Sequence, residues 1–397
     1  MNTADVGARG FSPLASRRVA GSHGRRGAVI VFVAALMVVL LGMAALTIDL
    51  GILYVARSEL QRTADAAALA AALDLLDEDI LKGAPYMAEE IAAATLSAVE
   101  YGQMNLVLNT APTIDPDSDV TIGYLYDPDD PNDVFTTMVD PSLYNSARVV
   151  VRRSSLNGDA ILFSFANIFG RSSADLAAEA TATYKNGVVG YKPTPDTGNA
   201  ELMPLALHTN VWNDLITGGS TAGDNYSFDP VTGAVTLGPD GIDEINLFPG
   251  NGATQLPPGN FGTVDIGSNN NSTADLSRQI RSGISESDLA AIGGEFSVPV
   301  SLHGDTGLSA AIKDDLASVI GLPRAIPLFS NVSGNGNNSM FDIVGFGGIR
   351  VMAVKLTGPM SSKHVLIQPA FVTDAAAVTG PGSGSSYYVY TPIRLTR

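Results

Sequence analysis

The sequence predicts an α+β protein in which a single N-terminal transmembrane helix continues into an extracytoplasmic helix, followed by a mixed α/β unit and a β-rich C-terminal domain. Three observations predict this: an uncharged apolar run near the N-terminus, an unbroken helical pattern after it, and short β-branched runs between turn clusters in the remainder. With 397 residues, 45% of them apolar, the chain can bury at least one sizeable core. We expect five segments: a cytoplasmic basic tail (1–27), the transmembrane helix (28–48), an extracytoplasmic helix with a mixed unit (49–185), a linker (186–200) and a Gly/Asn-rich β domain (201–397).

The apolar run at residues 28–48 contains 21 consecutive residues without a charge. As a helix it would be about 31 Å long, close to the hydrocarbon thickness of a bilayer. It has no polar face, whereas core helices of soluble proteins normally have one. The alternative is a cleaved signal peptide with a small-residue site at residues 42–44, but the apolar core of such peptides is only about 7 to 15 residues long. The length therefore favours a membrane anchor.

The charges on either side of the run predict its orientation. Four arginines lie within about 15 residues before it, and only Arg57 and Arg62 lie within a similar distance after it. The positive-inside rule then keeps the N-terminus in the cytoplasm and exports the rest of the chain. The net charge is −17, and the first 26 residues hold five arginines against one aspartate, so the other 371 residues carry −21. Such an acidic body argues against nucleic-acid binding.

The helical pattern continues beyond the membrane, interrupted before Leu76 only by Gly51, at a cost of about 1 kcal/mol. An almost wholly apolar stripe follows alternating four-three spacing through Leu46, Leu50, Leu53, Arg57, Leu60, Ala64, Ala67 and Ala71. We expect this stripe to pack on the soluble part of the same chain, and the alternative is a partner's helix, including self-association through residues 50–73. Asp49, at the edge of the membrane core, is costly unless hydrated or paired, and we expect hydration at the interface.

Short motifs surround this helix in a fixed order: Arg26-Gly27 before the span, Asp49-x-Gly51 at its exit, Tyr54, Leu60-Gln61, and Ala64-Asp65-Ala66-Ala67-Ala68. Over residues 25–73, their order and spacing closely resemble the N-terminal segment of the TadG-like proteins of the tight-adherence (Flp) pilus system. Looser similarity extends to residues 147–153, the LFSFANIFG stretch at 162–170, and residues 173–184, 259–267 and 341–358. Unlike type IV prepilins, which carry Glu at the fifth position after the cleaved glycine, this chain has Phe32 there after Gly27. The anchor is therefore expected to stay unprocessed.

The resemblance implies a non-enzymatic, membrane-anchored accessory protein of a Tad/Flp pilus assembly apparatus, with roles in fibre anchoring, attachment and biofilm formation. The implied partners are the membrane and other pilus-assembly proteins of the cell envelope. The residues it marks as family-motif or partner-helix candidates are Arg26, Gly27, Asp49, Gly51, Tyr54, Leu60, Gln61, Ala64, Asp65 and Ala68. The alternative function is an adhesin-like binding module that uses the distal domain independently of any pilus.

In the exported part, residues 86–104 are predicted to be helical and residues 120–126, 147–153 and 177–184 to form strands. Two prolines and three glycines make residues 186–200 a predicted linker. Further strands are expected in the distal domain near residues 325–329, 341–344, 349–356, 365–372 and 387–395. In the GFGG stretch at residues 345–348, which lies among these, we expect a bulge or close packing.

Motifs for catalysis, cofactors and metals are weak. The chain has no cysteine, no GxSxG elbow and no phosphate-binding GxxxxGK[ST] loop, and its histidines (His23, His208, His303 and His364) are far apart. A hydrolase would require two of the last three to converge with carboxylates. The acidic clusters at residues 115–119 and 127–133 depart from the EF-hand pattern, so we expect solvated turns there and neither a metal nor a cofactor.

Overall fold

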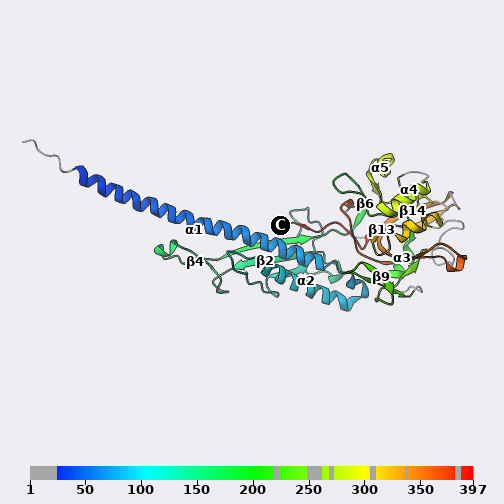
Figure 1. The fold of residues 1–397 in the computed structure, drawn as a ribbon, viewed down its shortest axis with the longest axis horizontal. Coiled ribbons are helices and arrows are strands. Elements are labelled where there is room, and N and C mark those ends of the chain that lie inside the picture. The colour runs from blue at the N-terminus through cyan, green and yellow to red at the C-terminus, as the bar shows by residue number, and fades with distance from the viewer. Residues whose placement is uncertain are drawn as a thin grey trace, which may run out of the picture. The chain divides into compact units, whose positions relative to one another are not determined.

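The computed structural model describes residues 25–218, 223–247, 262–267, 272–304, 310–335, 338–380 and 386–396. The chain forms two compact units, one made of Met1–Tyr54 with Leu162–Ala174 and the other of Val55–Ile161 with Asp175–Arg397. Helices and strands occur together, and the C-terminal region is rich in strands, which confirms the predicted fold class. Figure 1 shows the order of the elements along the chain.

The first unit contains the N-terminal part of α1 (Arg25–Asp74), a 50-residue helix that continues without a break into the second unit. In the part of the chain that the structure describes, α1 begins the one helix long and apolar enough to cross a membrane, with a mean hydropathy of 3.0 in its most apolar window. The rest of this unit is the segment Leu162–Ala174. It contains the turn η3 (Ala166–Phe169) and the strand β4 (Ser173–Ala174), both of which follow β3 (Ile161–Leu162).

The second unit begins with a helical layer formed by the rest of α1, η1 (Glu78–Lys82) and α2 (Ala84–Met104). The predicted helix at residues 86–104 is therefore confirmed. Of the predicted stripe, Leu60, Ala64, Ala67 and Ala71 are fully buried within this chain, whereas Leu46, Leu50 and Arg57 are exposed. The outer half of the stripe thus packs on the protein itself, as expected.

Small residues bring α1 and α2 close together. A Cβ atom added to Gly102 of α2 would lie 2.1 Å from Cδ1 of Ile114 and 3.6 Å from Cβ of Ala67. The Thr63 hydroxyl donates to the Asn105 carbonyl at 3.3 Å, and the Leu108 N–H donates to the Glu59 carboxylate at 2.7 Å. Alanines at the buried positions of α1 therefore permit the close approach that these contacts require.

A four-stranded antiparallel sheet follows, in the order β1 (Val120–Gly123), β2 (Ser146–Arg153), β5 (Leu176–Thr183) and β20 (Arg394–Leu395). Strand β2 pairs with β5 over its whole length, from Ser146 opposite Thr183 to Arg153 opposite Leu176. The three strands predicted in this region are confirmed, although the first ends at Gly123. The C-terminal strand β20 is the edge strand beside β5. Local sequence does not indicate this pairing, because the two strands are far apart in the chain.

The largest sheet has the order β10 (Ile245–Asn246), β15 (His364–Pro369), β14 (Met340–Lys355), β13 (Pro323–Ser333) and β7 (Leu207–His208), and β12 (Val300–His303) and β18 (Ser386–Tyr387) also pair with β14. Alternate β13 residues enter two different cores, Ile326 and Leu328 in one and Ala325 and Phe329 in the other. The sheet is thus buried on both faces, which explains its continuous apolar strands.

The predicted strands at residues 341–344 and 349–356 are a single strand, β14, that runs through the GFGG stretch. A Cβ atom on Gly347 would lie 2.9 Å from the Trp212 ring, and one on Gly348 would lie 2.3 Å from the Ala370 carbonyl oxygen. The pairing with β13 also shifts register beside this stretch. The expected close packing is therefore confirmed.

The remaining strands form small sheets: β6 (Val188–Tyr191) lies between β11 (Phe296–Ser297) and β17 (Ala377–Thr379), β16 (Val372–Thr373) pairs with β19 (Val389–Tyr390), and β8 (Tyr226–Asp229) pairs with β9 (Ala234–Leu237). Strand β6 lies inside the predicted linker, and its Val188 and Tyr191 are fully buried. Residues 186–200 are therefore not a free tether, because part of the segment belongs to a packed sheet. The domain boundary at this segment stays a prediction.

The distal region also contains short helices: α3 (Thr209–Ile216), α4 (Thr273–Ser282), α5 (Glu286–Leu289) and α6 (Lys313–Ala317). Single 3-10 turns are η2 (Pro141–Leu143), η4 (Ala290–Ile292), η5 (Ala310–Ile312) and η7 (Met360–Ser362). None of the four α-helices was predicted. The capping box of Ser272 and Asp275 at the start of α4 is the local signal that could have revealed one of them.

Candidate functional site at the membrane exit

Asp49 lies one residue beyond the uncharged segment and is only 3% exposed. Its Oδ1 accepts the Ser164 N–H at 2.8 Å, and its Oδ2 accepts the N–H groups of Phe165 and Ala166 at 3.1 and 2.6 Å. The expectation that Asp49 is simply hydrated is therefore wrong. Its carboxylate is paired with three backbone donors from a segment more than 100 residues away in the sequence.

The local structure of that segment explains the pairing. The N–H groups at the start of a helical turn have no partner inside the turn, and a nearby side-chain oxygen usually satisfies them. The turn η3 has Phe165 at its N-cap, a residue that supplies no side-chain hydrogen bond. Asp49 of α1 supplies the missing acceptor, and its negative charge also matches the positive end of the turn. It thereby fastens the segment Leu162–Ala174, which we call the membrane-exit hairpin, to the helix.

The other family-motif residues differ in exposure. Gly51 is exposed and Tyr54 is 79% exposed, whereas Leu60, Ala64 and Ala68 are fully buried. The buried three serve the packing of α1 inside this chain, which leaves them unavailable to a partner helix.

Gln61 and Asp65 form a polar pair on the same helix. The Gln61 amide donates to the Asp65 carboxylate at 2.9 Å and to the Glu179 carbonyl at 3.1 Å. Gln61 therefore ties α1 to β5. Arg26 and Gly27 lie in the first turn of α1. The structure does not describe how exposed these two residues are.

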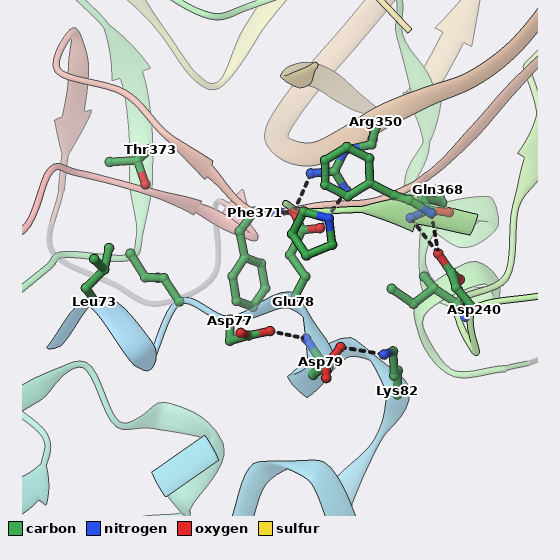
Figure 2. A pocket seen from close by; sticks show the side chains of 14 residues that line it. Leu73, Asp77, Glu78, Asp79, Lys82, Asp240, Arg350, Gln368, Phe371 and Thr373 are labelled. Carbon is green, nitrogen blue, oxygen red and sulfur yellow. Dashed lines mark hydrogen bonds and ion pairs between the residues drawn. The ribbon is translucent and has the colours of Figure 1, made fainter. Parts of the chain in front are cut away.

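A buried ion pair lies just beyond the end of α1. Arg350 of β14 is 4% exposed and donates to both carboxylate oxygens of Glu78 in η1, at 2.5 and 3.0 Å. The centre of the Phe228 ring lies 3.4 Å from the guanidinium carbon, and the Phe371 N–H donates to Glu78 at 2.9 Å. Figure 2 shows Glu78, Arg350 and Phe371. These residues line a cavity with a volume of about 330 Å³. Sequence reasoning missed this pair, although an arginine within an otherwise apolar strand is a signal for a buried partner.

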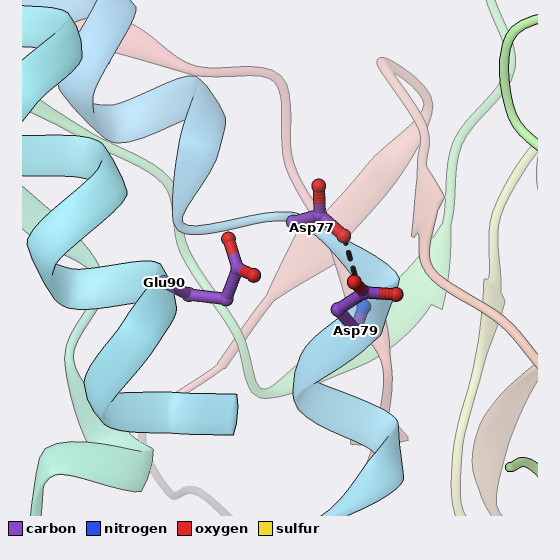
Figure 3. A group of neighbouring side chains, drawn as sticks. All are labelled: Asp77, Asp79 and Glu90. Carbon is purple, nitrogen blue, oxygen red and sulfur yellow. Dashed lines mark hydrogen bonds between the residues drawn. The ribbon is translucent and has the colours of Figure 1, made fainter. Parts of the chain in front are cut away.

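Three carboxylates gather beside this junction, as Figure 3 shows: Asp77, Asp79 and Glu90 have oxygens within 4.8 Å of one another. Removal from water, together with repulsion from neighbouring acidic groups, raises the pKa of Glu90 to about 7. Asp79 is also paired with Lys82. Lys82 offsets the charge of Asp79 in this group, whereas the raised pKa of Glu90 reflects desolvation and the crowding of like charges.

The acidic clusters expected to be solvated turns carry specific partners. Asp119 is buried and pairs with Arg152. The Lys185 ammonium lies 2.9 Å from Asp127 and 2.7 Å from Asp129, and this hydrogen bonding lowers the pKa of both carboxyls. Most of these carboxylates are exposed turn residues, as expected, but Asp119 is buried beside Arg152 and Lys185 binds two of the others.

The histidines do not form a metal centre in the described parts of the chain. Within the described residues, one group of three side chains is close enough to share an ion. It consists of Asp77, Asp79 and Glu90 and contains no histidine. His208 instead caps α3, where its Nδ1 accepts the Asn210 N–H at 3.0 Å, and it packs edge-on against Phe329. His303 lies in β12 and His364 in β15, whereas His23 lies outside the described residues.

These features define a class: a membrane-anchored protein with one apolar N-terminal helix whose outer half is built into an α+β body. Residues 27–74 match the family described as Flp pilus-assembly TadE/G-like, and residues 59–182 match the family described as Tad-like Flp pilus-assembly. The two matches together cover residues 27–182 and confirm the resemblance to the TadG-like proteins of the Flp pilus system. The first match contains Asp49, and the second contains its three partners. No curated protein and no solved structure matches the chain.

Proposed function

We propose that this protein is a non-enzymatic accessory of the Tad/Flp pilus assembly apparatus, anchored in the bacterial inner membrane with its N-terminus in the cytoplasm and its body in the periplasm or outside the cell. Its role is to hold the fibre or its assembly machinery at the membrane, and thereby to support attachment and biofilm formation. The observation that carries the proposal is the continuity of α1, whose family-matched residues form the apolar span and then contribute fully buried residues to the body.

The contact with other envelope proteins is proposed to lie around Gly51 and Tyr54. These two are motif residues that no buried packing role in this chain explains, because both are exposed. Tyrosine buries a large apolar ring and keeps a polar tip, which makes it common in protein interfaces. The buried motif residues instead explain why the helix needs alanine at so many positions.

A photo-crosslinking amino acid placed at Tyr54, in the full chain in its native membrane, tests this contact. We expect crosslinks to other proteins of the pilus apparatus from position 54, and only crosslinks within the chain from the buried position Ala64. Equal capture from both positions, or none from position 54, would contradict the proposed contact.

The wider role is tested by deleting the gene and complementing it with the full chain. We expect loss of surface pili together with loss of attachment. Normal pili and normal attachment in the deletion strain would contradict the proposal, and normal pili with lost attachment would favour the adhesin-like alternative.

A further inference from the structure

The membrane-exit hairpin exposes an unusual number of large apolar side chains. Leu162, Ile168 and Phe169 are 73, 80 and 78% exposed, and Phe165 is 37% exposed. No charged residue occurs between Ala160 and Gly170, and Arg171 follows directly. A contiguous exposed apolar group of this kind usually marks a surface that contacts a protein or a membrane.

The position of the hairpin is set by Asp49. Its three hydrogen bonds hold residues 164–166 beside the helix one residue after the uncharged span ends. On the same face of α1, Ala45 and Gly42 are partly covered, whereas Ala34 and Ala35 farther into the span are exposed. Figure 1 draws the β4 hairpin alongside α1. A group held at this level lies at the bilayer surface when α1 crosses the membrane.

The backbone of the hairpin is suited to an apolar environment. The Phe163 N–H donates to the Ser172 carbonyl at 3.0 Å and closes the hairpin, while the N–H groups of Ile168, Gly170 and Arg171 donate to carbonyls within the turn at 3.0 to 3.1 Å. Asp49 satisfies the three donors at the start of the turn. Backbone groups can leave water only when they are paired in this way.

We propose that the membrane-exit hairpin inserts into the interfacial region of the leaflet from which α1 emerges, as a second membrane contact. Leu162, Ile168 and Phe169 enter the boundary between headgroups and acyl chains, a depth of about 5 to 10 Å for interfacial segments. Arg171 stays at the polar level, where a cation is favoured near lipid phosphates. The inference rests on membrane anchoring by α1 and does not depend on the proposed role in pilus assembly.

Lipid is favoured over a protein partner because the hairpin is held at Asp49, directly beside exposed apolar residues of the anchor. Leu46, Ile48 and Leu50 are exposed on α1 beside Asp49. A protein partner that covered the hairpin would also have to exclude lipid from these side chains. The bilayer covers both surfaces at once.

A depth measurement with spin labels tests the insertion. The chain has no cysteine, so a single nitroxide can be attached through Ile168→Cys in the full chain, in single-copy nanodiscs of phosphatidylcholine and phosphatidylglycerol. Val38→Cys inside the span and the fully exposed Leu156→Cys in the body serve as references. We expect the label at position 168 to be more accessible to oxygen and better shielded from a water-soluble nickel chelate than the label at position 156, at a depth shallower than that of position 38. A label at position 168 as accessible to the nickel chelate as the label at position 156 would overturn the proposal. A surface that binds a protein partner would give this same result, because the nanodiscs contain only this chain.

Asp49→Asn in the Ile168→Cys background tests the positioning role of the carboxylate. We expect the label to move toward the aqueous reference while the label at position 38 stays in the membrane, which shows that the anchor is intact. Asp65→Asn, a neutralisation farther along the same helix, is the matched control and should leave the label in place. A label that keeps its depth in Asp49→Asn would overturn positioning by Asp49.

Discussion

Arg350 and Glu78, 272 residues apart, form a two-pronged ion pair in which the guanidinium is almost completely buried. The Arg350 Nε also donates to the Gly321 carbonyl at 3.0 Å. The pair joins the turn after α1 to the central strand of the largest sheet. A helix that carries the family motifs is thereby connected to the distal region, which neither family match covers.

Replacing one member of this pair is expected to destabilise the protein. Arg350→Met leaves the Glu78 carboxylate without its cation, and breaking a buried pair in this way costs about 3 kcal/mol in the free energy of unfolding. The measurement is urea unfolding of the detergent-solubilised chain. Arg394→Gln, which removes the exposed pair with Asp129, is the control and should cost about 1 kcal/mol or less. Equal losses in the two variants would show that burial does not strengthen the Arg350 pair.

Neutralising Asp49 is expected to loosen the membrane-exit hairpin. Its carboxylate accepts the N–H groups of residues 164–166, so Asp49→Asn removes the charge that strengthens these hydrogen bonds. Hydrogen exchange of a peptide covering residues 162–170 should accelerate by about tenfold or more, because local opening then costs less. Exchange in α2 should not change, and an unchanged rate in the hairpin would contradict the assigned role of Asp49.

Glu90 predicts a specific dependence of stability on pH. Desolvation and the neighbouring carboxylates raise its pKa from 4.5 to about 7 in the folded protein, so between these values the folded state binds more protons than the unfolded state. The Glu90 contribution to stability therefore falls as pH rises through this window. We expect Glu90→Gln to flatten this part of the profile and to raise the melting temperature at pH 8. Glu100→Gln, an exposed change on the same helix, should preserve the slope, and an identical slope in Glu90→Gln would refute the assignment.

Enlarging a buried alanine of α1 is expected to separate the two packed helices. Ala67 is fully buried against the close approach of α2 at Gly102, so Ala67→Leu overpacks the contact at a cost of about 1 to 3 kcal/mol. Thermal unfolding measures the loss. Ser58→Leu adds a similar volume at an exposed position of the same helix and should change the melting temperature little. A stable Ala67→Leu variant would mean that the interface tolerates leucine and that the alanine has another purpose.

Local patterns predicted the elements with strong periodicity. The apolar run and the small-residue stripe predicted α1, and the helix and three strands of the family-matched region were also predicted, because each contains its own hydrophobic period. The short helices of the distal region were missed because their four to ten residues carry too little periodicity. The segment near residues 387–395 was predicted as one strand but divides among β18, β19 and β20, which join three different sheets.

The sequence by itself determined the anchor, the continuity of its helix, the family of the N-terminal part and the acidic character of the body, because these depend on composition and on spacing along one segment. Only the tertiary structure decided what Asp49 does, which motif residues are buried, and that Arg350 meets Glu78. In all three cases the residue contacts a distant segment whose position depends on the whole fold. For Asp49 and Arg350 the contact is a polar partner, which a charge near an apolar segment must find; for the motif residues it is the packing surface that buries them.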